Sequence, residues 1–195
     1  MQTFQDQLVL FAGKKADEIL RLADTTGSIE GWLRAEAALA ALDGYFGALG
    51  ASDRVFAEGG RTDLALHRAG KKTAVEFKFA FNNKNLIGGY NGTGGIEKDL
   101  KKLSQQKSFD EKYVAVFFAF YSRHVHGQEL NKFYGQHAKG IALQPSSEHD
   151  DFDLFCAGLA NQVVGSLSFV GKPSGVHAIK AESGSWLGLW CHQVA

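Results

Sequence analysis

Hydrophobic residues occupy every second position on both sides of a tight turn at residues 69–72. This alternating apolar set consists of Leu64, Leu66, Val75, Phe77, Phe79 and Phe81. A period of two is typical of strands that place one face on a core. Gly70 can supply the positive φ that a tight turn needs. The pattern therefore predicts a β-hairpin over residues 61–81.

Three stretches have apolar residues at helical spacing, namely residues 3–23, residues 28 to about 42 and residues 96–108. Ser28 is the expected N-cap of the second helix. The side chains of this helix that are expected to pack inward are Ile29, Trp32, Leu33, Leu39 and Leu42. The third helix is amphipathic, with its lysines off the apolar stripe.

Further strands are expected before and after the hairpin. Residues 54–56 read as a short strand, and residues 112–121 are apolar on both faces, which predicts a central strand covered on both sides. The Gly- and Asn-rich residues 82–95 are expected to form a loop. Residues 155–194 read as short strands with Gly and Ser turns. Together these elements predict an α/β (α+β) protein with a mixed central sheet flanked by helices.

Composition limits the class of protein but does not indicate a function. The chain has 195 residues, 45% hydrophobic and 22% charged, which suits a single domain over residues 1–195 with a sizeable core. No apolar run is long enough to span a membrane, and the N-terminus lacks a basic leader, so a cytoplasmic protein is expected. Cys156 and Cys191 form no spacing motif and are expected to be buried, reduced thiols.

The formal net charge is zero, but the charges are unevenly distributed. Residues 68–112 hold 10 Lys and Arg against 5 Asp and Glu, whereas the remainder holds 11 against 16. This basic half contains the second strand of the hairpin and the helix after it. It is consistent with either a solvated face or a phosphate-binding face.

The hairpin gathers ionisable residues on one side. Asp63, Glu76 and Lys78 alternate with the apolar set, so they share the opposite face. A two-residue loop at residues 69–70 places Asp63 opposite Glu76, whereas a shifted or four-residue loop places it opposite Lys78. Two carboxylates facing each other across strands are destabilising. A bound cation or the lysine removes that cost.

A hard cation fits this arrangement, because Mg²⁺ prefers carboxylate and carbonyl oxygen and keeps several waters. Asp63, Glu76 and the carbonyl of Phe77 are the predicted protein ligands, with Glu36 as a third carboxylate, and Mn²⁺ is the expected substitute for Mg²⁺. Such a cation activates water and stabilises charge on a phosphate. Lys78 is then available to orient or deprotonate the attacking water, or to contact the phosphate.

The order Glu36, Asp63, Glu76-Phe77-Lys78 resembles the motif of the PD-(D/E)XK nuclease superfamily, which has the restriction-endonuclease-like fold. The resemblance covers about residues 28–121 and leaves residues 122–195 as a C-terminal extension. It departs from the family pattern at residues 61–62, where Arg-Thr stands in place of the proline that often precedes the aspartate.

The resemblance implies Mg²⁺-dependent cleavage of phosphodiester bonds, with DNA as the usual substrate. It makes Lys78, Glu76, Asp63 and Glu36 the catalytic residues, with Glu30 a rival of Glu36. It also places a lysine or glutamine of the following helix at the site. The residues expected to contact nucleic acid are Lys71, Lys84, Lys98, Lys102 and Gln105.

Two other function classes remain open from the sequence. The same fold could bind nucleic acid through its basic residues without cleaving it, which predicts a steep salt dependence. Alternatively, the protein could act through a protein partner or a homodimer, using the aromatic residues of the last third. Those aromatic residues are Phe152, Phe155, Trp186 and Trp190.

Overall fold

The computed structural model describes residues 3–25, 29–57, 62–81, 92–120, 177–183 and 186–195. The helices of these ranges are α1 (Phe4–Thr25), α2 (Glu30–Leu42) and α4 (Gly92–Ser104). The strands are β1 (Arg54–Ala57), β2 (Leu64–Arg68), β3 (Lys71–Phe81), β4 (Glu111–Phe120), β5 (His177–Lys180) and β6 (Trp186–Gln193). The predicted helices, the hairpin and the central strand are thus confirmed to within a few residues at their ends.

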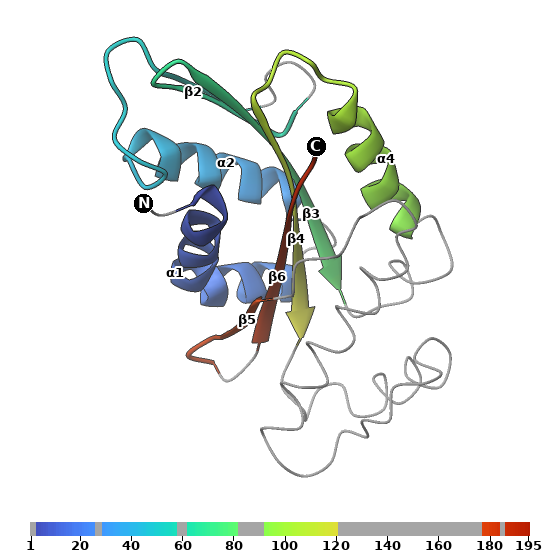
Figure 1. The fold of residues 1–195 in the computed structure, drawn as a ribbon. Coiled ribbons are helices and arrows are strands. Elements are labelled where there is room, and N and C mark those ends of the chain that lie inside the picture. The colour runs from blue at the N-terminus through green and yellow to red at the C-terminus, as the bar shows by residue number, and fades with distance from the viewer. Residues whose placement is uncertain (1–2, 26–28, 58–61, 82–91, 121–176, 184–185) are drawn as a thin grey trace.

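The described strands form one mixed sheet of six in the order β1-β2-β3-β4-β6-β5. β3 and β4 are parallel, and the other neighbours are antiparallel. A parallel pair needs a crossover connection, and α4 supplies its helix. Figure 1 shows α1 and α2 on one side of the sheet and α4 on the other. The predicted mixed sheet flanked by helices is therefore what the structure shows.

The hairpin has the two-residue loop that was one of the open alternatives. Arg68 pairs with Lys71, and Ala69 and Gly70 have φ of 49° and 79°. Positive φ at both loop residues is the signature of a type I′ turn, whose twist matches that of the flanking strands. The paired residues end at Leu64 and Val75. Continuing this register by one residue places Asp63 opposite Glu76.

The two faces of the sheet are buried by different helices. Odd-numbered residues of β3, β4 and β6, such as Phe77, Phe117 and Leu189, belong to the core that α1 and α2 cover. Even-numbered residues face α4, which packs against β3 and β4. Val114, Val116 and Trp190 are all fully buried there. The central strand β4 is thus covered on both sides, as its sequence predicted, and Trp190 is a core residue rather than an interface residue.

Several details differ from the expectations. Leu39 and Leu42 are more than half exposed, because α2 places its small residues Ala37 and Ala41 against the core instead. Residues 92–95, expected in a loop, form the start of α4. Ile29 precedes α2 without a side-chain cap, and Ser28 lies outside the described residues. Cys191 is a free, buried thiol, as predicted.

Other expectations fall outside the described residues. These are Lys84, Cys156, Phe152, Phe155 and most of the predicted loop at residues 82–95. None of the helices in the described part of the chain is both long enough and apolar enough to cross a membrane.

Candidate functional site

β3 extends beyond the end of β2 and leaves an edge that side chains cover. In the antiparallel register, the N–H groups of Phe77 and Phe79 point to the side from which β2 has departed. The carboxylate of Asp63 accepts a hydrogen bond from the N–H of Phe77 at 2.7 Å. The carboxylate of Glu30 on α2 accepts one from the N–H of Phe79 at 3.3 Å. The two carboxylates thus accept the backbone hydrogen bonds that a neighbouring strand would otherwise accept.

Glu76 is the most deeply buried acid of the group, with 2% of its surface exposed. The ammonium of Lys102 on α4 lies 2.5 Å from its Oε1. This ion pair gives the buried carboxylate an opposite charge in direct contact. Burial raises the pKa of Glu76 to about 7, Lys102 opposes that shift, and the charge of Asp63 adds to it. Burial therefore disfavours the charged form of Glu76, and Lys102 offsets part of this cost.

Lys78 lies on the same face of β3, two residues further on. Its ammonium is 3.0 Å from Oδ2 of Asp99 on α4 and 3.7 Å from Oε2 of Glu30. Burial alone would lower the pKa of Lys78, but the carboxylates of Asp99 and Glu30 outweigh it and hold the pKa above its usual range. This direction is opposite to the one that a lysine base needs. It keeps the side chain cationic and favours the other predicted role, contact with a phosphate.

Glu36 does not join this group, contrary to expectation. Its carboxylate forms a 3.0 Å ion pair with Lys15 of α1. Six residues separate Glu36 from Glu30, which is about 240° around a helix, so the two cannot point to the same side. α2 directs Glu30 toward the edge of β3 and Glu36 toward α1. The rival residue, Glu30, is the glutamate that α2 brings beside Lys78.

Two further residues belong to the group and were not predicted. Asp99 lies in the apolar stripe of α4 between Ile96 and Leu103, where a charged residue is out of place, and this was a readable signal. Arg34, one turn after Glu30, places its guanidinium 3.4 Å from Asp63. These residues alternate in charge, so each buried ion has an opposite charge nearby. We call Glu30, Arg34, Asp63, Glu76, Lys78, Asp99 and Lys102 the charged cluster.

The remaining predicted contacts to nucleic acid have different surroundings. Lys98 and Gln105 are exposed, on α4 and just after it, and Lys102 is part of the charged cluster. Lys71 is 64% exposed and forms a 2.6 Å ion pair with Glu111 at the hairpin end of β3, which is five residues from Glu76. Lys71 is therefore separate from the cluster by about 17 Å of strand.

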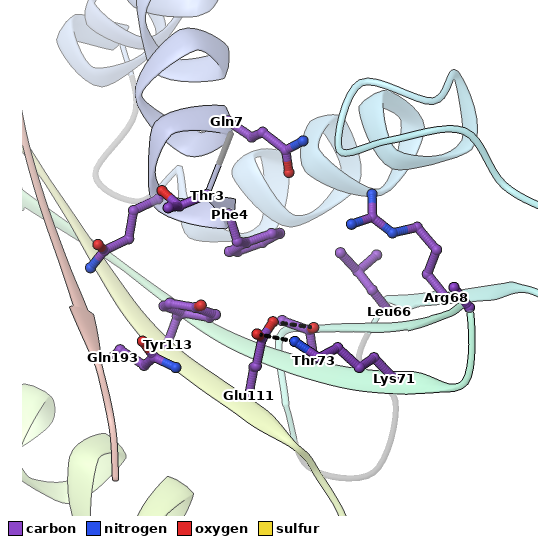
Figure 2. A pocket seen from close by; sticks show the side chains of 12 residues that line it. Thr3, Phe4, Gln7, Leu66, Arg68, Lys71, Thr73, Glu111, Tyr113 and Gln193 are labelled. Carbon is purple, nitrogen blue, oxygen red and sulfur yellow. Dashed lines mark hydrogen bonds and ion pairs between the residues drawn. The ribbon is translucent and has the colours of Figure 1, made fainter. Parts of the chain in front are cut away.

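Lys71 instead borders a pocket of about 490 Å³ on the α1 side of the sheet. Figure 2 shows this pocket between the start of α1 and the ends of β2, β3 and β4, with the Lys71–Glu111 pair on its rim. Phe4 and Tyr113 approach each other there, with ring centroids 4.9 Å apart. The sheet separates this pocket from the face that carries Glu76 and Lys78, so the pocket is not part of the charged cluster.

The donor set of the cluster fits a hard divalent cation in part. No three Asp, Glu, His or Cys side chains within the described ranges form a metal-binding group. Mg²⁺, however, is usually held by one or two carboxylates and completes its shell with water. Asp63 and Glu76 face each other, and the Phe77 carbonyl points to the same open edge as its N–H. Oε1 of Glu76 is engaged by the ammonium of Lys102, so a cation at Glu76 would displace this ion pair.

Comparison of the sequence and structure with protein families, curated proteins and solved structures found no match. Interpretation of the charged cluster therefore rests on its chemistry.

Proposed function

We propose that this protein is a metal-dependent nuclease of the PD-(D/E)XK type that hydrolyses phosphodiester bonds, with DNA as the expected substrate. The observation that carries the proposal is that Asp63, Glu76 and Lys78 lie together where β3 extends beyond β2, with Glu76 buried and Asp63 hydrogen-bonded to the N–H of Phe77. The register of β2 and β3, continued one residue beyond the paired strands, sets Asp63 across from Glu76, and Lys78 follows on the same face of β3. The mixed sheet with α4 between parallel strands β3 and β4 also agrees with the fold that this motif implies.

In this proposal Asp63, Glu76 and the carbonyl of Phe77 would hold Mg²⁺ or Mn²⁺. A bound divalent cation supplies Lewis-acid stabilisation of phosphate charge and lowers the pKa of water. Lys78, kept cationic by Asp99 and Glu30, binds a non-bridging phosphate oxygen and stabilises the charge that develops there. Asp99 and Glu30 thereby orient the ammonium group without touching the substrate.

Lys102 has a different role from the one its helix suggested. Its ammonium neutralises Glu76 when the cation is absent, and this ion pair limits repulsion between Glu76 and Asp63. A cation held by Glu76 would replace this ion pair, and the side chain of Lys102, which is 34% exposed, would then be available to a phosphate. α4 thus contributes a lysine at the site, as the family resemblance implies.

Plasmid nicking by the purified protein tests the proposed function. We expect supercoiled DNA to be converted to the nicked form in Mg²⁺ or Mn²⁺ and to remain intact in EDTA. Nicking that persists in EDTA, or that an Asp63→Asn and Glu76→Gln double variant retains, would contradict a metal-dependent mechanism at this site.

The two glutamates of α2 are expected to differ in importance. Glu30→Gln removes a carboxylate that holds Lys78, so nicking should fall by about tenfold or more. Glu36→Gln removes only the partly exposed pair with Lys15 and should leave nicking unchanged. Initial nicking rates of the two variants measure the difference. The reverse ranking would restore Glu36 as the third carboxylate.

A nucleic-acid-binding module without cleavage is the second candidate. The observation that favours it is the pairing of the cluster's acids with cations, because Glu76 contacts Lys102 and Asp63 contacts Arg34. Binding with a steep salt dependence but without turnover in any divalent metal would support this candidate.

A further inference from the structure

A row of aromatic rings lies on the same face of the sheet as Glu76, toward the β1 edge. Phe56 of β1 and His67 of β2 are in edge-to-face contact, with ring centroids 5.2 Å apart. Phe109, between α4 and β4, continues the row at 6.5 Å from His67. We call Phe56, His67 and Phe109 the aromatic platform.

The strand register places this platform next to the charged cluster. Phe56 is opposite Ala65, and Ala65 is opposite Ala74. This row is two residues along the strands from the position where Asp63 faces Glu76, a separation of about 7 Å. Opposite residues in a sheet share a face, so the rings and the carboxylates lie on the same side.

The platform is open among the described residues. α4 packs against β3 and β4, and the ring of Phe56 on the outer strand β1 stays 41% exposed. His67 and Phe109 are half-buried, and the small Ala65 beneath them is buried. A single exposed apolar side chain is common on a protein surface, but three grouped rings beside a charged cluster form a surface that can stack a ligand.

Three cationic residues lie near the rings in the strand register or in the sequence. Arg54 and Lys72 share a row with His67 in the register and are exposed, and the exposed Lys107 lies two residues before Phe109. The nearby acid Asp110 is engaged, because its carboxylate accepts a hydrogen bond from the N–H of Lys72. Aromatic rings among cations are the features that bind single strands, through base stacking and phosphate contacts.

We propose that the aromatic platform stacks unpaired bases and so directs a single-stranded nucleic acid, or the unpaired strand of a junction, to the charged cluster. The bases of a duplex are already stacked on their neighbours and cannot occupy the rings without opening. The platform therefore selects for unpaired substrate. This inference rests on the proposed function for its substrate class and adds to it a preference for single strands.

Fluorescence anisotropy in EDTA, where no hydrolysis occurs, tests the inference with a labelled DNA single strand, its duplex and an RNA of the same sequence. The intact protein should bind the single strands more tightly than the duplex. Phe56→Ala should raise the Kd for the single strand about tenfold or more and leave the duplex Kd unchanged. Phe56→Trp, which keeps an aromatic face, should retain single-strand affinity.

Leu39→Ala is the matched control, because it removes a 55% exposed apolar side chain from α2 on the other side of the sheet. It should change neither affinity. The inference is overturned if Phe56→Ala weakens both substrates equally, if it weakens neither, or if the intact protein binds no single strand. If Phe56→Ala loses single-strand affinity but the intact protein cleaves no DNA, the aromatic platform is supported and the proposed nuclease activity is refuted. If the intact protein cleaves DNA but Phe56→Ala binds the single strand with unchanged affinity, the nuclease activity is supported and the aromatic platform is refuted. The RNA arm reports which sugar the platform accepts.

Discussion

Lys78→Ala is expected to reduce metal-dependent nicking by about a hundredfold or more. The reason is that Lys78 is a half-buried cation on the face of Glu76, and loss of one such group at a developing phosphate charge costs rates of this order. The nicking rate at saturating Mg²⁺ measures the effect, with circular dichroism to confirm that the variant is folded. Because Asp99 and Glu30 stabilise the charged form of Lys78, activity should not require its deprotonation.

Lys14→Ala provides the matched control for this experiment. Lys14 of α1 lies over the ring of Tyr45, away from β3, and its substitution removes the same charge. It should nick DNA at the rate of the intact protein. Wild-type nicking in Lys78→Ala would remove Lys78 from the mechanism, and equal losses in both variants would point to a general effect of charge.

Glu76→Gln is expected to make stability less sensitive to pH. Folding raises the pKa of Glu76 from 4.5 to about 7, because burial disfavours the charged form. The stabilising contribution of this group is therefore complete below pH 4.5 and is lost as pH rises through about 7. Between pH 4.5 and pH 8 the intact protein should lose about 3 kcal/mol of unfolding free energy relative to Glu76→Gln.

Urea unfolding of both proteins at pH 4.5 and pH 8 measures this difference. Glu18→Gln is the control, because that carboxylate is 56% exposed on α1 and carries no such burial cost. The same pH dependence of the unfolding free energy in the intact protein and in Glu76→Gln would show that burial does not raise the pKa of Glu76. A buried acid that costs stability at neutral pH is expected where function, rather than folding, requires it.

Local periodicity predicted most of the fold. Alternation around residues 69–72 and helical spacing in α1 and α4 are properties of short stretches, and these elements formed with their ends within about four residues of the prediction. Exposure was harder to predict, since Leu39 and Leu42 are apolar but lie outward. The close approach of α2 to the sheet uses alanines, which carry little hydrophobic signal in the sequence.

Only the residues of the charged cluster that lie on the hairpin were predictable from the sequence. Asp63, Glu76 and Lys78 lie on one hairpin, so the strand period of two determines that they share a face. Glu30 and Asp99 come from helices on opposite sides of the sheet, and their approach depends on how α2 and α4 are rotated. Helical rotation decided between Glu30 and Glu36, and the sequence had left that choice open.

Isothermal titration with Mn²⁺ tests most directly whether Asp63 and Glu76 hold one divalent cation together. We predict saturable binding to the intact protein, loss of that binding in Asp63→Asn and in Glu76→Gln, and its retention in Glu36→Gln. The absence of saturable heat from the intact protein, or undiminished heat from the two acid variants, would contradict the proposed site.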